Sequence, residues 1–427
     1  MIFNSVNEKF IFYSFPVVLF SLVPFFLITG PFLSDLSISL ISLLFLLYCF
    51  KKKNFSYFKN KYFFFFLIFW VYLIFNTLIN NFNINSLKIS FFFFRYGVFV
   101  TAIVALLNTN DNFIKYFFYC IFICFVALIL DGFYQYFVGQ NILGFKTIVN
   151  TRVSSFFHDE LILGSYLSRL WPIFYGLFIL VFKKKTISFY LFILIFILSD
   201  VLIFLSGDRV AFFYINLSAI FVILLSQKLF KLRLFILLTS ILLIIIISFI
   251  NPKAYERVFV DTLSQMNLHS EKKQEEPIYI FSKQHTHHYI TAFRMFLDNK
   301  VLGVGVKNFR NFCSDKKYIV SEFSCATHPH NSFIQILVET GLIGFLFLIT
   351  IFFYFCKNIF KHLMLKLQGK YYFTDFQICV LSAIAIYLWP FAPTGNVFNN
   401  WINIALILNL PFFIWSRKIG HAKKFFK

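Results

Sequence analysis

The sequence predicts an all-α, polytopic membrane protein with about 12 transmembrane helices and one large outer loop. Two observations support this fold class. The chain is 59% hydrophobic and only 13% charged, whereas a soluble domain carries about a quarter charged residues. Apolar segments of about 20 residues, the length that spans a bilayer, also recur along the whole chain. The first segment leads directly into the second without a small-residue cleavage site, so we expect a retained helix and no cleaved signal peptide.

The expected spans divide the chain into three regions. Residues 1–250 hold helices one to nine, residues 251–332 form the outer loop with amphipathic helices, and residues 333–427 hold the last three helices and a tail. We place the spans near residues 11–29, 32–50, 62–80, 88–107, 114–135, 161–182, 187–206, 209–227, 232–250, 333–355, 372–390 and 398–415.

Positive charge alternates between the connections. Lys and Arg gather after the second, sixth, eighth, tenth and twelfth spans, while opposite loops such as 80–85 and 395–400 nearly lack them. By the positive-inside rule the basic side is the cytoplasm, so both termini are expected there and residues 251–332 on the outer side. The formal net charge of +21 is therefore a topology signal and not a nucleic-acid footprint. The basic residues are Lys51, Lys52, Lys53, Lys59, Lys61, Lys183, Lys184, Lys185, Lys228, Lys231, Arg233, Lys357, Lys361, Lys366, Lys370, Arg417, Lys418, Lys423, Lys424 and Lys427.

The seven cysteines are scattered, with no C-x-x-C pair and no zinc-finger spacing to a histidine. Five of them lie in or beside apolar runs and are expected to behave as small buried hydrophobic residues. Cys313 and Cys325 both lie in the outer loop, where an oxidising compartment would allow a disulfide between them. The chain has no H-E-x-x-H motif, which excludes a metalloprotease of that type.

A first candidate site is Ser206-Gly207-Asp208-Arg209, at the outer junction of the seventh and eighth spans. An arginine at a membrane interface can be an anchor that reaches the lipid headgroups. A two-residue turn with Asp and Arg between apolar helices also makes a compact anion site. Arg209 would there bind a phosphate, and Asp208 would hold its guanidinium in place.

A second candidate is the stretch from His285 to Phe309. Its apolar residues recur at helical spacing, which predicts an amphipathic helix across the outer mouth that ends near Asp298-Asn299. Gly303 and Gly305 then give a flexible turn. We do not interpret them as a nucleotide-binding motif, because a G-x-G alone is a very weak signal. His285, His287 and His288 match no standard zinc spacing, so we expect no metal and a surface or phosphate-binding role.

The third candidate runs from Thr327 to Gly344 and contains His328, His330 and Asn331. Pro329 disfavours the helical conformation at His328, and Asn331 or Ser332 can cap the tenth span. His330 would then be held at the membrane surface, where an imidazole suits general-base chemistry. The alternative is a pair of solvated loop histidines.

Taken together, these motifs resemble the O-antigen ligase and O-antigen polymerase superfamily of bacterial envelope glycosyltransferases. The resemblance rests on H-N-S-F-I-Q-x-L-x-E-x-G-x-x-G at the end of the loop, on A-F-R-M-F-L-D-N-K-V-L-G-V-G-V-K-N-F within it, and on the upstream S-G-D-R-V-A. It implies transfer of a glycan from an undecaprenyl-diphosphate carrier, at the periplasmic face of the inner membrane, to the lipid A core by a ligase or to another repeat unit by a polymerase. Arg209 would bind the diphosphate, and His330 would activate the acceptor hydroxyl without a cofactor or metal.

One departure from the family leaves alternatives open. The family carries an arginine before the loop helix, where this chain has its histidines, and the nearest arginine, Arg294, lies inside the helix. Either Arg294 turns to the pocket or a histidine replaces the cation. Arg152 in the other outer loop is a further candidate for the diphosphate. A transporter would also fit 12 spans with buried cations such as Arg95 and Arg169, but the two halves show no duplication. We favour a ligase over a polymerase.

Overall fold

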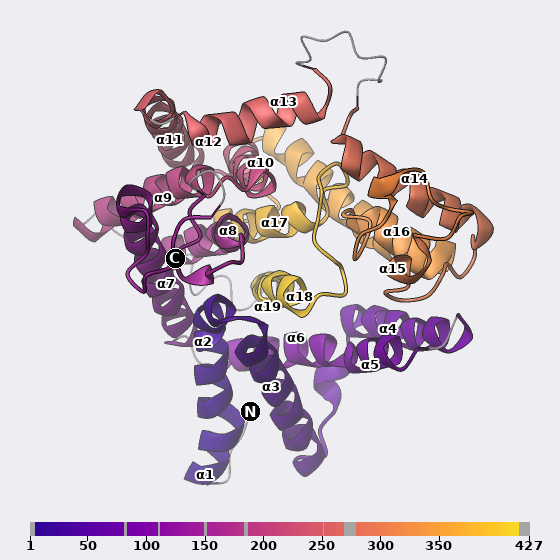
Figure 1. Ribbon diagram of the computed structural model, residues 1–427. Helices are drawn as coiled ribbons and strands as arrows, with labels where there is room; N and C mark the ends of the chain where they lie inside the picture. The colour runs from indigo at the N-terminus through magenta and orange to yellow at the C-terminus, as the bar shows by residue number, and fades with distance from the viewer. Residues whose placement is uncertain are drawn as a thin grey trace.

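The computed structural model describes residues 5–80, 83–109, 112–148, 152–182, 187–250, 252–268 and 279–417. Within these ranges the protein is all-α, with two isolated β-bridges and no β-strand (Figure 1). This confirms the predicted class. The basic residues Lys183 to Lys185 and those after Arg417 lie outside the described ranges.

The first half of the chain contains α1 (Val6–Lys9), α2 (Phe15–Thr29), α3 (Pro31–Lys51), α4 (Lys61–Ile79), α5 (Ile84–Phe92), α6 (Phe94–Leu107), α7 (Asn112–Val138), α8 (Leu163–Val181), α9 (Ile187–Leu205), α10 (Arg209–Leu225) and α11 (Phe230–Ile250). The second half contains α12 (Lys253–Tyr255), α13 (Asp261–Gln265), α14 (Lys283–Asp298), α15 (Phe309–Phe312), α16 (Ser332–Leu367), α17 (Asp375–Tyr387), α18 (Asn400–Ile407) and α19 (Leu410–Arg417).

Each predicted span coincides with one of these helices or with a broken pair. Eight helical segments of the described chain are long and apolar enough to cross a membrane, and three shorter apolar helices lie at 189–205, 209–225 and 375–387. The last predicted span is divided into α18 and α19. A total of 12 crossings stays a prediction.

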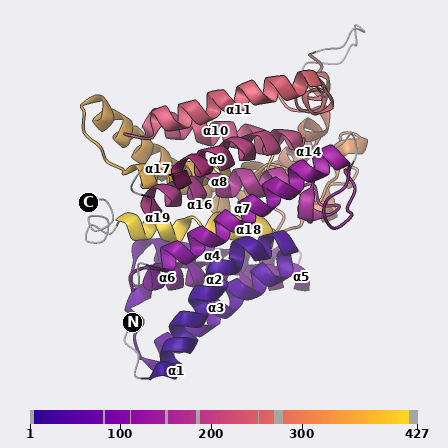
Figure 2. The same ribbon diagram turned by 90° about the vertical axis from the view of Figure 1, so that its left-hand side faces the viewer.

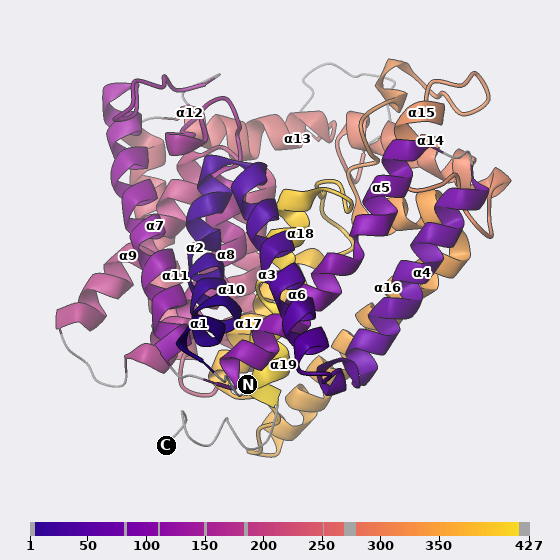
Figure 3. The ribbon, with the colours of Figure 1, turned by 90° about the horizontal axis from the view of Figure 1, so that it is seen from below.

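The helices pack around α8, which is buried over most of its length. In Figure 3 the long helices run from one end of the molecule to the other, with α12 to α15 across one end and α1 and α19 at the opposite end. Figure 2 shows α7 and α11 inclined beside the central helices. The segments around the predicted outer loop therefore gather at one end of the bundle.

One basic residue departs from the predicted pattern of loop charges. Arg233 is buried inside α11, where it donates to Asp200 Oδ2 over 2.9 Å and its guanidinium lies 4.0 Å from the Trp171 ring centroid. Counting it among solvated cytoplasmic charges was wrong, because a buried arginine requires a partner and finds one in α9. The pair ties α11 to α9 instead.

Candidate functional site

The glycine turn at Gly303 and Gly305 packs into a break in α16. Gly341 has φ 64° and ψ −168° and interrupts the helix. Backbone bonds from the turn replace the lost helical ones: Val304 N donates to Val338 O over 2.9 Å, and Gly305 N donates to Glu339 O over 2.9 Å. In return, Leu342 N donates to Lys300 O over 2.9 Å. The turn is therefore held rigidly rather than being the flexible linker expected from its glycines.

Polar side chains of α4 fix the same junction from the other side. Tyr72 Oη donates to Thr340 O over 2.5 Å, and Asn76 and Asn80 both donate to Leu302 O, over 2.5 and 3.2 Å. The buried Glu339 accepts from Gln335 Nε2 over 3.1 Å. These bonds attach the second motif to the third, and they place the N-terminal end of α16 in a set position.

Four histidines meet beside that end of α16. The His330 ring centroid lies 4.1 Å from that of His328, 5.3 Å from that of His288 and 5.4 Å from that of His285. His330 adopts a positive φ of 57°, which is uncommon for a residue other than glycine and is found at functional sites. Its ring nitrogens have no hydrogen-bond partner among the described residues. The outer loop histidines thus form a cluster rather than a solvated pair.

The loop between α17 and α18 holds this cluster in place. Thr394 N donates to His330 O over 2.8 Å, and Thr394 O lies 3.1 Å from His328 Nε2. Asn331 caps α16 by accepting from Phe333 N and donates to Pro390 O over 2.8 Å. Asn331 thus has the capping role that the sequence predicts.

The amphipathic helix α14 brings two of the histidines. Its buried side includes His288, Thr291 and Met295, and Ser282 caps its start. His287 lies apart, with Nδ1 2.6 Å from Ser321 Oγ. Within the described chain both ring nitrogens of the buried His288 lack a partner. His285 and His288 therefore belong to the cluster, while His287 fixes the 321–324 turn.

The cluster favours neutral imidazoles. Burial lowers the pKa of His285 and of His288 to about 4, and the neighbouring His330 acts in the same direction. Burial also lowers the pKa of His328 to about 3 and that of His330 below its ordinary value. At neutral pH His330 is thus unprotonated, which is the state that a proton acceptor needs.

Three arginines from separate segments meet at the first motif. Arg152 Nε donates to Ser206 O over 3.0 Å. A Cβ placed on Gly207 would lie 3.1 Å from Arg152 Nε and 3.3 Å from Arg257 Cγ, so both side chains pack against this glycine. Arg209 Nη1 donates to Gln265 Oε1 over 3.0 Å and to Thr262 Oγ1 over 3.2 Å. We call Arg152, Arg209 and Arg257 the arginine cluster.

The charges of the arginine cluster are only partly neutralised. Burial lowers the pKa of Arg152, Asp208 opposes this shift, and Arg257 adds to it. Arg257 pairs with Asp261 over 3.4 Å, and its buried Nε has no partner in the described structure. Three cations thus face two carboxylates, which leaves a positive site suited to an anion.

Asp208 does not pair with Arg209 among the described ion pairs. It caps α10 by accepting from Ala211 N over 3.0 Å, and it accepts from Ser165 Oγ over 2.9 Å. The carboxylate thus turns to the helix end, and it acts on Arg209 through its charge: burial lowers the pKa of that guanidinium, and the charge of Asp208 opposes this shift. Thr262 and Gln265 position that guanidinium instead.

The arginine and histidine clusters adjoin one another. Arg209 is among the groups that lower the pKa of His285, after burial, His330 and His288. Tyr289, one residue beyond His288 on α14, neighbours Tyr214 of α10. Arg209 therefore lies close enough to the histidine cluster for its charge to act on His285.

Three further predicted residues, Arg294, Cys313 and Cys325, take structural positions. Arg294 is exposed and donates to Ile319 O over 2.9 Å. Cys313 and Cys325 are joined in a disulfide that closes the loop between α15 and the 322–324 turn. Among the described residues no group of three His, Cys, Asp or Glu side chains forms a metal site.

Arg257 is the residue that sequence reasoning missed. It follows the ninth span in a segment without a recognised motif, and only the fold carries it to Gly207. The available signal was a short amphipathic pattern, in which Val258 turns inward while Tyr255 and Phe259 are exposed. In Figure 1 α12 and α13 lie above α9 and α10.

Comparison with known proteins bears on the central part of the chain. Residues 191–349 match the family model described as O-antigen ligase. The match spans α9 to the first half of α16, and so includes Arg209, Arg257 and His330. No curated protein matches the sequence. The match confirms the resemblance drawn from the motifs: residues 191–349 carry an O-antigen ligase domain of the O-antigen ligase superfamily.

Proposed function

We propose that this protein transfers a glycan from undecaprenyl diphosphate to the lipid A core at the periplasmic face of a bacterial inner membrane. The observation that carries the proposal is the meeting of the arginine cluster with the histidine cluster around His330. The family match supports a ligase or polymerase type of activity in general. Membrane lipids surround the bundle in this proposal, and nucleic acid has no part in it.

The donor diphosphate would bind the arginine cluster. Guanidinium groups bind phosphate oxygens in pairs and stay charged, so they suit a diphosphate better than lysines do. Arg152 and Arg257 both pack against Gly207, the glycine two residues before Arg209, so the three guanidinium-bearing side chains belong to one site. As the sugar leaves, charge develops on the diphosphate, and the fixed cations stabilise it without a metal.

The acceptor hydroxyl would be activated by His330. Its neutral ring takes the hydroxyl proton, the hydroxyl oxygen bonds to the anomeric carbon of the donor sugar, and the bond from that carbon to the phosphate oxygen breaks. The electron pair leaves with the lipid diphosphate. His328, His285 and His288 exclude water and keep His330 in place, and Asn331 fixes the backbone beside it.

The test uses a strain that lacks the native protein. Envelope glycolipids are separated by gel after rescue with the native chain, with His330→Ala or with Arg209→Ala. We expect the native chain to restore polymer on lipid A and both variants to fail, with long carrier-linked chains accumulating. His158→Ala is the matched control, because His158 lies in the other outer loop and pairs with Asp159.

Three results would change the proposal. Full rescue by His330→Ala would remove the general base from the mechanism. Glycolipid capped with a single repeat in the deletion strain would identify a polymerase, which uses the same donor. A topology experiment that places His330 in the cytoplasm would contradict both the reaction and its proposed location.

A further inference from the structure

A cavity lies where the 390–399 segment and α18 meet α5 and α6, and none of the clustered histidines lines it. It has a volume of about 180 Å³ and is lined by Lys88, Ile89, Phe92, Phe93, Arg95, Tyr96, Phe398, Asn400 and Asn403. These residues come from α5, from the start of α6 and from the segment that leads into α18. Two cations thus line a cavity within otherwise apolar helices, where ionisable residues are costly and usually functional.

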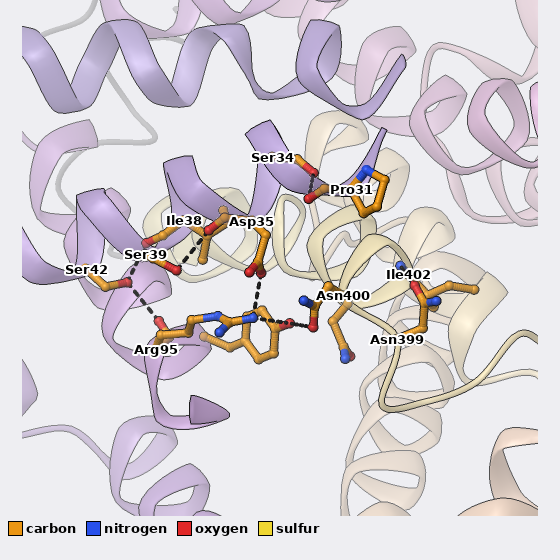
Figure 4. A network of polar contacts seen from close by, with 12 residues as sticks. Pro31, Ser34, Asp35, Ile38, Ser39, Ser42, Arg95, Asn399, Asn400 and Ile402 are labelled. Carbon is orange, nitrogen blue, oxygen red and sulfur yellow. Dashed lines mark hydrogen bonds and ion pairs between the residues drawn. The ribbon is translucent and has the colours of Figure 1, made fainter. Parts of the chain in front are cut away.

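The Arg95 guanidinium has an ion-pair partner for one nitrogen and no partner for another. Its Nη2 donates to Asp35 Oδ1 over 2.5 Å, and its guanidinium lies 5.1 Å from the Tyr96 ring centroid. Figure 4 shows this side chain extended between Asp35 of α3 and Asn400 of α18. Its buried Nε has no partner in the described structure. The Arg95–Asp35 ion pair therefore fixes the position of the guanidinium but leaves its Nε–H without an acceptor.

The other polar groups add donors and positive charge. Lys88 is exposed at the edge of the cavity. Tyr96 Oη donates to Asn400 Oδ1 over 3.1 Å, so the amide nitrogen of Asn400 keeps its capacity to donate. Arg95 pairs with Asp35, whereas Lys88 has no ion pair among the described residues, so the lining keeps an excess of positive charge. The cavity therefore suits a small anionic group.

The surroundings indicate a lipid as the carrier of that group. Phe91 and Phe92 beside the cavity are about half exposed, at 49% and 50%, as expected for side chains that face acyl chains. Asp35 lies just after the first turn of α3, and Asn400 is the first residue of α18. In the predicted topology both helices begin at the outer surface, which is the depth of lipid headgroups.

We propose that this cavity binds the phosphate-bearing headgroup of a lipid from the outer leaflet. The 390–399 segment contacts both this cavity and the histidine cluster. Thr394 of that loop bonds to His330, while Phe398 lines the cavity. If the proposed function holds, the bound lipid stands beside the donor, where a phosphorylated glycolipid acceptor is needed. The same chemistry is offered by an anionic phospholipid.

The experiment measures lipid binding by the purified full-length protein in detergent, using native mass spectrometry. Phosphatidylglycerol, phosphatidylcholine and lipid A are titrated separately. We expect the anionic lipids, phosphatidylglycerol and lipid A, to bind better than the zwitterionic phosphatidylcholine. Lys88→Gln should lower that preference about fivefold, as expected for one basic residue near an anionic lipid. Ile89→Trp, which fills the cavity without changing charge, should lower it as well.

Lys146→Gln is the matched control, since Lys146 is an exposed lysine of the other outer loop. Preference for lipid A alone assigns the cavity to the acceptor, and equal preference for both anionic lipids assigns it to bulk phospholipid. Binding of phosphatidylcholine as tight as that of the anionic lipids overturns the proposal, as does a preference that survives both cavity variants. Because Arg209→Ala should abolish transfer and leave lipid binding intact, failure of the proposed function is distinguishable from failure of this site.

Discussion

Replacing Gly341 by alanine tests whether the glycine turn is joined to α16 as the structure shows. Gly341 has φ 64° and ψ −168°, a region that only glycine adopts freely. An added Cβ would lie 2.2 Å from Val301 O and 2.6 Å from Gly303 N, which are backbone atoms that cannot turn away. We therefore expect Gly341→Ala to detach the turn.

The magnitude follows from two costs. Backbone strain at such a position costs about 1–3 kcal/mol, and an overpacked contact costs about 1–3 kcal/mol more. Their sum of about 2–6 kcal/mol compares with the net worth of the backbone bonds at the junction, at about 1 kcal/mol each. The equilibrium between attached and detached turn should shift at least roughly 30-fold.

Native-state hydrogen exchange measures this shift directly. The amides of Val304, Gly305 and Leu342 donate across the junction, so their protection should fall in the variant. Gly369→Ala is the matched control, because Gly369 also has a positive φ, of 72°, but has nothing within 4 Å of an added Cβ. Equal protection of the three amides in both variants would refute the reasoning.

Other perturbations address the clusters separately. Arg257→Ala should lower the transfer rate at least roughly 100-fold, as for loss of one charge-stabilising group, and Arg257→Lys should recover part of it. Arg294→Ala should stay close to the native rate in the same assay. Equal losses in Arg257→Ala and Arg294→Ala would contradict the assignment. Since His285 and His288 have folded pKa values of about 4 against 6.5 unfolded, their stabilising contribution is complete above pH 6.5 and is lost as pH falls towards 4. Limited proteolysis of α14 should show this loss, and unchanged cleavage at pH 4.5 would argue against it. Cys313→Ser should increase cleavage between α15 and the 322–324 turn, as should reduction of the native chain, and resistance of both would show that the disulfide does not order this loop.

The positions of the helices could be predicted because apolar length alone specifies a membrane helix. The capping role of Asn331 and the end of α14 at Asp298 are local properties, and both agree with the structure. Long-range relations were not accessible. The break at Gly341 reads in sequence as one more glycine in an apolar helix, and its partner lies some 40 residues earlier. The burial of Arg233 could not be predicted for the same reason, since its partner Asp200 belongs to another span.

The charges of the described residues indicate which side chain can replace the arginine that the family carries before the loop helix. Arg294 is exposed and bonds to Ile319 O, so it does not serve the cluster. His285 and His288 do lie beside His330, but burial lowers their pKa values to about 4. A neutral imidazole supplies no positive charge at pH 7. Arg257 is the better candidate, because its charge is permanent and it packs, like Arg152, against Gly207. Under the proposed function we therefore expect the segment after the ninth span to supply the cation for the diphosphate, and the histidines of α14 to shield His330.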